Sequence, residues 1–226
     1  MVPQKICSQL GAMYGRVMNS TKTFEQTPKS KMSGLALAAI PLGILLNLGI
    51  GTIATAIKAP IYADAIGTIL MTLLLGMRAG IIVGVASFVL GGFLTNPALP
   101  YFSGTQACIA IYVGVIAARG GLRNKWLIIA SGIGLGILAA IVSAPIIVWL
   151  FGGITGSGVS VVTAFMIASG KSVLKSVILA GAAAEPIDKT IQLFVAIWIL
   201  RGLPQSLLAK FTGGSLVQNG FLRSTQ

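Results

Sequence analysis

Three ionisable residues, Glu185, Asp188 and Lys189, lie near the middle of an apolar run at 173–200. A charge at that depth of a membrane helix costs about 3 kcal/mol, so such groups usually face the interior of a helix bundle or a watery cavity. Glu185 and Lys189 are four residues apart, which allows an ion pair on one helix face, and Asp188 adds a second acid. The cluster either locks the last helix to its neighbours or belongs to a transport site.

Other polar and aromatic residues stand at the ends of further apolar segments. Asp64 begins one of them, where either the helix dipole favours a carboxylate or the residue binds substrate at a cavity mouth. The uncharged loop 95–103 combines two prolines with two adjacent aromatic residues. It forms either an interfacial aromatic belt or a stiff lid over a small polar ligand. We predict one cavity formed by Asn47, Asp64, Asn96, Tyr101, Phe102, Gln106 and Glu185.

The composition of the whole chain indicates an integral membrane protein. The 226 residues are 55% hydrophobic and 9% charged, and the mean hydropathy is +0.94. Cys7 and Cys108 are the two cysteines and there is no histidine, which excludes a disulfide framework and a zinc site of the usual ligand types. The net charge of +12 is better explained by orientation in a membrane than by nucleic acid. We therefore expect no metal, no cofactor and no nucleic-acid partner.

Six apolar segments are predicted to cross the bilayer, giving an all-α bundle of six transmembrane helices. They are 34–57, 62–77, 79–94, 104–118, 126–151 and 173–200. The second and third are short for full crossings, which indicates tilt or helices that do not reach both interfaces.

Small residues follow one face of two of these segments. They form a stripe on the first (Ala39, Gly43, Asn47, Gly51 and Thr55) and a seam on the fifth (Gly132, Gly136, Ala140 and Ala144). Small residues let two helix backbones approach closely, so both faces should contact protein rather than lipid. Asn47 in the stripe either bonds a neighbouring helix or offers a hydrogen bond to a ligand.

The membrane domain at 33–205 is expected between a polar basic arm at 1–32 and a polar tail at 206–226. The arm, the tail, Arg78 and the basic turn 119–125 carry most of the lysines and arginines. The positive-inside rule places these parts, and so both termini, in the cytoplasm. The uncharged loop 95–103 and the Gly/Ser/Thr/Val linker 152–170 then face outward, and the predicted cavity opens to the outside.

Two stretches resemble a known family of transport proteins. Residues 61–84 read IYADAIGTILMTLLLGMRAGIIVG, and residues 184–189 read AEPIDK. This is similar to the substrate-capture (S) components of bacterial energy-coupling factor transporters. Many of those proteins have an aspartate before Ile-Gly-Thr at the start of the second helix, a glycine-bounded turn, and an acid with an Asp-Lys pair in the last helix. The similarity covers about residues 33–205 and is greatest to the generic branch without an assigned substrate.

The resemblance implies a protein of the bacterial plasma membrane that binds a vitamin-like micronutrient near its outer face. It also implies docking onto a membrane scaffold (T) subunit that carries two cytoplasmic ATPases, followed by toppling that releases the substrate inside. The loops 58–62, 95–103 and 152–170 would close over the ligand. The family docks through an Ala-x-x-x-Ala motif on the first helix, for which this chain offers Gly34/Ala38 and Ala39/Gly43.

The sequence contains no catalytic constellation and no Gly-rich phosphate-binding motif, so we expect no enzyme activity and ATP hydrolysis in partner subunits. Two other classes of protein fit the same features. One is an ion- or proton-coupled secondary transporter that uses Glu185, Asp188 and Lys189. The other is a membrane sensor whose outer pocket binds a ligand without transport.

Overall fold

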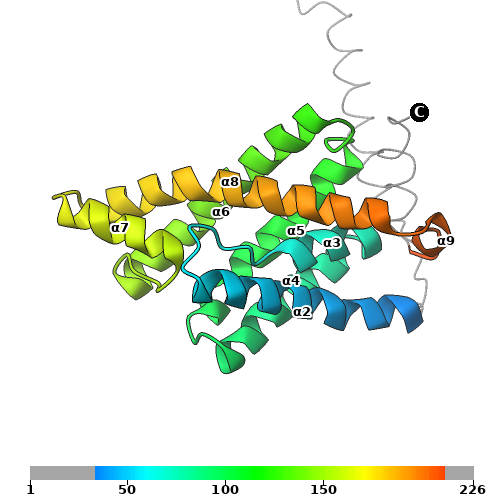
Figure 1. The fold of residues 1–226 in the computed structure, drawn as a ribbon, viewed down its shortest axis with the longest axis horizontal. Coiled ribbons are helices and arrows are strands. Elements are labelled where there is room, and N and C mark those ends of the chain that lie inside the picture. Colours follow the sequence, from blue (N-terminus) through cyan, green and yellow to red (C-terminus); the bar gives the residue numbers. More distant parts are fainter. Residues whose placement is uncertain (1–33, 212–226) are drawn as a thin grey trace, which may run out of the picture. The chain divides into compact units, whose positions relative to one another are not determined.

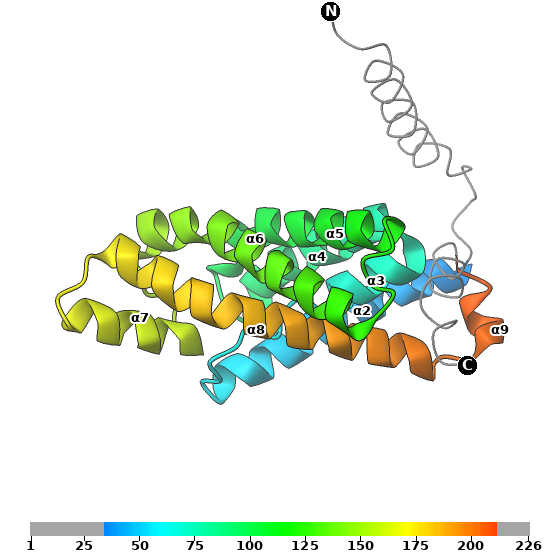
Figure 2. The same cartoon turned by 90° about the horizontal axis from the view of Figure 1, so that it is seen from above.

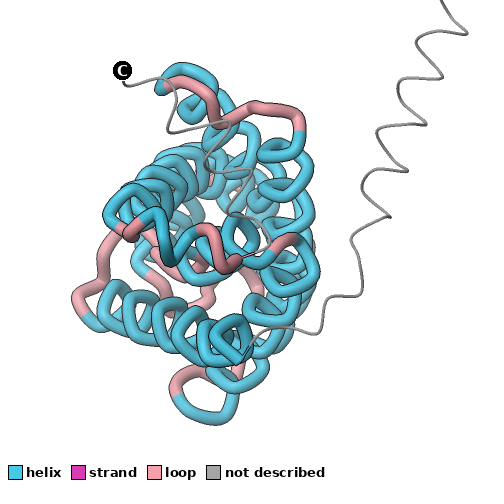
Figure 3. Tube along the Cα trace, turned by 90° about the vertical axis from the view of Figure 1, so that its right-hand side faces the viewer, coloured by secondary structure: helices cyan, strands magenta, loops and turns pink. Residues whose placement is uncertain are grey.

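The computed structural model describes residues 34–211, and every regular element there is helical, with no strand among them (Figures 1 and 3). The elements are α2 (Gly34–Ala56), α3 (Ile66–Leu75), α4 (Met77–Leu94), the 3-10 helix η1 (Leu99–Phe102), α5 (Ser103–Ala118), α6 (Lys125–Phe151), α7 (Gly158–Ala168), α8 (Val173–Gly202) and α9 (Gln205–Leu208). The all-α prediction is confirmed for these residues. The predicted arm 1–32 and residues 212–226 of the predicted tail lie outside the described part of the chain.

Within residues 34–211, four helices are long and apolar enough to cross a membrane, which indicates a membrane-embedded protein. They are Leu37–Ala56, Met77–Leu94, Leu99–Ala118 and Lys125–Phe151. The 30 residues of α8 would also reach across, but this helix carries the charged cluster. The 10 residues of α3 span only about 15 Å, half the hydrocarbon thickness, so the second predicted segment is indeed short.

The short helix α3 is the most enclosed element of the described residues. Its residues from Ile66 to Leu74 are all buried, as expected for a helix that is apolar on every side. It packs against α4, α5 and α8, and Gly67 contacts the backbone of Gly43 on α2 so closely that no side chain would fit there. Helices α2, α4, α5 and α8 therefore pack around α3.

The two small-residue faces contact protein, as predicted. Helices α6 and α8 run side by side in Figures 1 and 2. Gly136 of the seam lies against the backbone of Pro186 and Glu185, and Gly132 lies against Thr190. On α2, Gly43 faces Met71 and Val83, and Asn47 is buried. Both faces are therefore largely covered by protein, although Thr55 at the end of the α2 stripe is exposed.

Two predicted boundaries are wrong. The stretch 152–170, expected to be a linker, contains α7, whose Val159, Ser160 and Thr163 are buried and which packs on α8. The tail expected from 206 onward begins as part of the helical body, because Leu208 and Phe211 belong to the hydrophobic core. In both places packing against the bundle outweighs a composition that indicates a loop.

Candidate functional site

A cavity of about 290 Å³ lies among α2, α4, α5, α6, α8 and the loops between helices. Its volume is at the lower end of the range of about 300–1000 Å³ found for small-molecule pockets. Six of the seven residues predicted to share a cavity line it: Asn47, Asp64, Asn96, Phe102, Gln106 and Glu185. The three connections expected to cover a ligand all border it, through Tyr62 and Asp64, through Thr95, Asn96, Ala98, Leu99 and Phe102, and through Thr155 and Ser157.

Lys189 is the centre of the charged cluster. Its Nζ lies 2.8 Å from Asp188 Oδ2 and 3.0 Å from Asp64 Oδ1. The distance to Glu185 Oε2, four residues back on the same helix, is 3.6 Å. The ring of Tyr62 packs over the ammonium group, 5.6 Å from Nζ to the ring centroid. Asp64 thus joins the three predicted residues of the charged cluster as a fourth member.

Asp64 does not stabilise a helix N-terminus, which was one of its two predicted roles. Helix α3 begins at Ile66 with Ala65 as its N-cap. The Asp64 side chain instead faces Lys189 and keeps 22% of its surface exposed. It therefore connects the charged cluster to the cavity.

Asp188 has a structural role within the cluster. Its Oδ1 accepts hydrogen bonds from the backbone N–H groups of Tyr62 and Ala63, at 3.2 and 3.0 Å, and its Oδ2 accepts from the Gln192 side chain at 2.7 Å. Ala63 has a φ of 52°, a left-handed conformation that costs a non-glycine residue about 1–2 kcal/mol. Asp188 is fully buried and does not line the cavity. It holds the loop 57–65 against α8 and helps to offset this strain.

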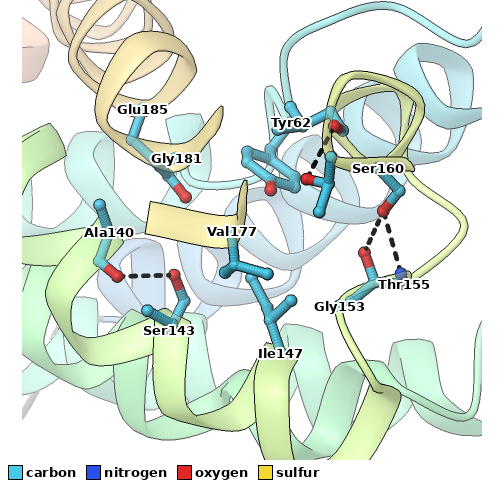
Figure 4. A pocket seen from close by; sticks show the side chains of 13 residues that line it. Tyr62, Ala140, Ser143, Ile147, Gly153, Thr155, Ser160, Val177, Gly181 and Glu185 are labelled. Carbon is cyan, nitrogen blue, oxygen red and sulfur yellow. Dashed lines mark hydrogen bonds between the residues drawn. The ribbon is translucent and has the colours of Figure 1, made fainter. Parts of the chain in front are cut away.

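Glu185 forms the open side of the cluster. It is 5% exposed, and its Oε2 has no hydrogen-bond partner among the described residues. Figure 4 shows its side chain directed into a recess that Ser143 and Tyr62 also border. This recess, about 10 Å³ in volume, is roughly the size needed for one water molecule. Glu185 lines both the recess and the larger cavity.

Asn47 and Gln106 belong to a buried polar network at the cavity wall. Asn47 Oδ1 accepts from the N–H groups of Gly67 and Thr68, and its Nδ2 donates to Thr68 Oγ1 at 2.8 Å and Ser87 Oγ at 3.1 Å. Both donors and both acceptor sites of Asn47 are thus occupied. The geometry favours the interhelical role over the ligand role. Gln106 accepts from Thr68 Oγ1 at 2.7 Å and donates weakly to the Asp64 carbonyl at 3.4 Å, which leaves one N–H for a ligand.

The loop 95–102 separates its two aromatic residues. Phe102 lines the cavity and stacks on Phe151, with ring centroids 5.9 Å apart. Tyr101 is 57% exposed and is absent from the cavity wall, so the structure does not bring it to the predicted site. Asn96 uses its Oδ1 to accept from the Ala98 N–H at 2.9 Å, which stiffens the loop. Its side-chain amide N–H groups have no acceptor among the described residues.

The predicted docking residues fall into two pairs. Gly43 is buried against α3 and Ala39 is half-buried against the core of the same chain. Gly43 therefore packs inside the protein, whereas Ala39 keeps part of its surface exposed. Gly34 and Ala38 are exposed, and their role in docking stays a prediction.

Several lining residues were not singled out from the sequence. They are Tyr62, Thr105, Ser143, Thr155 and Ser157, each a hydroxyl-bearing residue. Tyr62 and Thr105 are close in sequence to Asp64 and Gln106, so their positions could have identified them as candidate lining residues. Burial, together with the nearby Glu185 carboxylate, raises the pKa of the Tyr62 hydroxyl above its ordinary value, so this loop residue stays a neutral donor. The Thr105 Oγ1 is buried without a partner among the described residues.

The loops around the cavity also contact one another. Lys58 Nζ donates to the Gly156 carbonyl at 3.3 Å, and Gly158 lies directly against the backbone of Ala59. These contacts join the α2–α3 connection to the segment before α7.

Comparison of the chain with protein-family models, with curated proteins and with solved structures gives no match.

Proposed function

We propose that this chain is a membrane-embedded solute-binding protein that acts as the substrate-capture component of an ATP-driven importer of vitamin-like micronutrients. The observation that carries the proposal is the cavity, which is ligand-sized and enclosed by helices. Its wall combines apolar and aromatic surface with a few unsatisfied polar atoms, Glu185 Oε2 and Thr105 Oγ1. Such a combination is typical of sites for small molecules.

The orientation that we propose has six crossings and both termini in the cytoplasm. The segment 62–77, which contains the short helix α3, and the helix α8 complete the four long apolar helices. The uncharged loop 95–103 and the α7 region then lie outside, and the basic turn 119–125 lies inside. In this orientation, all three connections that border the cavity lie on the outer side of the membrane. The cavity would therefore load from outside a bacterial cell.

Partner subunits supply the energy in this proposal. The sequence has no phosphate-binding motif, and residues 61–84 and 184–189 resemble the capture components of energy-coupling factor transporters. A membrane scaffold subunit with two ATPases would dock on the exposed part of α2, which includes Gly34 and Ala38.

A second candidate, an ion- or proton-coupled secondary transporter, is favoured by one observation. Glu185, Lys189 and Asp64 line the cavity itself, where an ionisable cluster could exchange a proton or cation during transport. Uptake into vesicles separates the two candidates. An uncoupler would abolish uptake by a secondary transporter, whereas the capture component would need its ATPase partners and nucleotide.

The binding function is tested by native mass spectrometry of the full chain purified in mild detergent. We expect a bound small molecule, and we expect Gln106→Ala to reduce its occupancy while Ser131→Ala, on the side of α6 that meets Gly121, leaves it unchanged. Isolation from native membranes should recover the ATPase subunits. A chain that carries no small molecule and brings down no ATPase would contradict the proposal.

A further inference from the structure

We propose that the ligand of the cavity is a small organic cation whose charged nitrogen lies against the Glu185 carboxylate. The inference rests on the proposed solute-binding function and specifies the chemistry of its ligand. Three of the chain's four acidic residues, Asp64, Glu185 and Asp188, meet at this site. Among the described residues, Lys189 is the one basic residue in the cavity wall. A single ammonium therefore faces three carboxyl groups.

The distances show which carboxyl group lacks a partner. Asp188 is satisfied by Lys189, by Gln192 and by two backbone N–H groups of the loop 57–65. Asp64 receives a hydrogen bond from Lys189 at 3.0 Å. Glu185 lies 3.6 Å from the same ammonium, beyond the usual N–H···O length of about 2.7–3.2 Å. Its Oε2 is a buried carboxylate oxygen that has no hydrogen-bond donor among the described residues.

Glu185 shares its one cationic neighbour among the described residues with Asp64 and Asp188, so the charge of this buried carboxylate is only partly compensated. A buried carboxylate that is poorly paired is costly, and a second positive partner would stabilise it. Glu185 lines a space of about 290 Å³, which is far larger than a metal ion requires. No group of three or more His, Cys, Asp or Glu residues in the range 34–211 is arranged to hold a metal. A solute that brings its own cationic nitrogen supplies the missing partner.

The remainder of the wall fits the uncharged part of such a molecule. Phe88, Leu99 and Phe102 provide apolar and aromatic surface. Thr105 Oγ1, which is buried and unpartnered, provides one hydrogen-bonding group. An anionic solute would meet two acidic side chains of the wall, Asp64 and Glu185, against one lysine. The wall therefore selects cations over anions.

The test uses the full chain in detergent and a complex nutrient broth separated by ion exchange into cationic, neutral and anionic fractions. Binding is read as a rise in the midpoint of thermal unfolding and as a bound mass in native mass spectrometry. We expect the cationic fraction to give both signals. Once the bound compound is known, Glu185→Gln should weaken its binding on the order of thirtyfold or more, the loss typical when one partner of a buried charge pair is removed.

Ser131→Ala, whose side chain bonds the Gly121 carbonyl and does not line the cavity, is the matched control and should bind like the native chain. Binding from the neutral or anionic fraction would overturn the inference and leave the proposed function intact. The inference would also be overturned if the Glu185→Gln variant, with the same unfolding midpoint as the native chain in the absence of ligand, bound the cationic compound with unchanged affinity. If no fraction gives either signal, the inference and the solute-binding function both fail.

Discussion

Replacing Asp188 by alanine should destabilise the fold strongly. Three donors would lose their acceptor, namely the N–H groups of Tyr62 and Ala63 and the Gln192 amide, and the Lys189 ammonium would lose the nearer of its two acceptors. Asp188 is fully buried, so water has no access to replace it. Removing one partner of a buried charge pair typically costs about 3–5 kcal/mol. We expect a loss of that size in the free energy of unfolding.

Asp64→Ala is the matched control because Asp64 contacts the same ammonium. Its side chain is 22% exposed, and Lys189 would keep its 2.8 Å contact with Asp188. We expect Asp64→Ala to cost about 1 kcal/mol or less, as for partly solvated ion pairs. Both variants can be unfolded in mixed detergent micelles and followed by circular dichroism. Equal losses, or a larger loss for Asp64→Ala, would refute the view that Asp188 anchors the loop 57–65.

Three further substitutions have defined outcomes. Gly136→Ala should lower the free energy of unfolding by about 1–3 kcal/mol because the added methyl meets the backbone of α8, whereas Gly49→Ala, which meets no atom within 4 Å, should not. The same unfolding assay should show a loss of about 1–3 kcal/mol for Asn47→Ala, because this change leaves buried donors and acceptors unpaired. An unchanged midpoint would contradict the role of Asn47 in joining α2, α3 and α4. Phe102→Ala should weaken binding of the co-purified compound in a titration, and Tyr101→Ala should not; the reverse order would show that the loop is arranged differently around the ligand.

Much of the helical architecture was predictable because the signals are local. Apolar runs of bilayer length gave the four long helices, and the four-residue repeat through Gly132 and Gly136 gave the packing face between α6 and α8. The same spacing rule gave the Glu185 and Lys189 pair. The composition of residues 152–170 predicted a linker because Gly, Ser, Thr and Val have weak helix propensity. Helix α7 forms there nevertheless, and its contact with α8 supplies the missing stability.

The sequence predicted most of the residues that line the site but not the contacts that they make with one another. Asp64 and Lys189 are 125 residues apart, and no periodicity relates positions at that distance. The saturation of Asn47 depends on the positions of three neighbouring residues, Gly67, Thr68 and Ser87, which only coordinates provide. Tyr101 and Phe102 are adjacent in the chain, and the 3-10 turn that contains them sends one to the surface and the other to the cavity.

The contact between Gly136 and the backbone at Glu185 and Pro186 has a consequence for specificity. The carboxylate sits where it does because the residue opposite it has no side chain, so the distance between two helices sets the position of the charge. A methyl group added to α6 would displace the acid without touching any bound compound. Searches for selectivity determinants that consider only side chains within reach of the ligand would overlook Gly136, although changing it should retune which compounds the chain accepts.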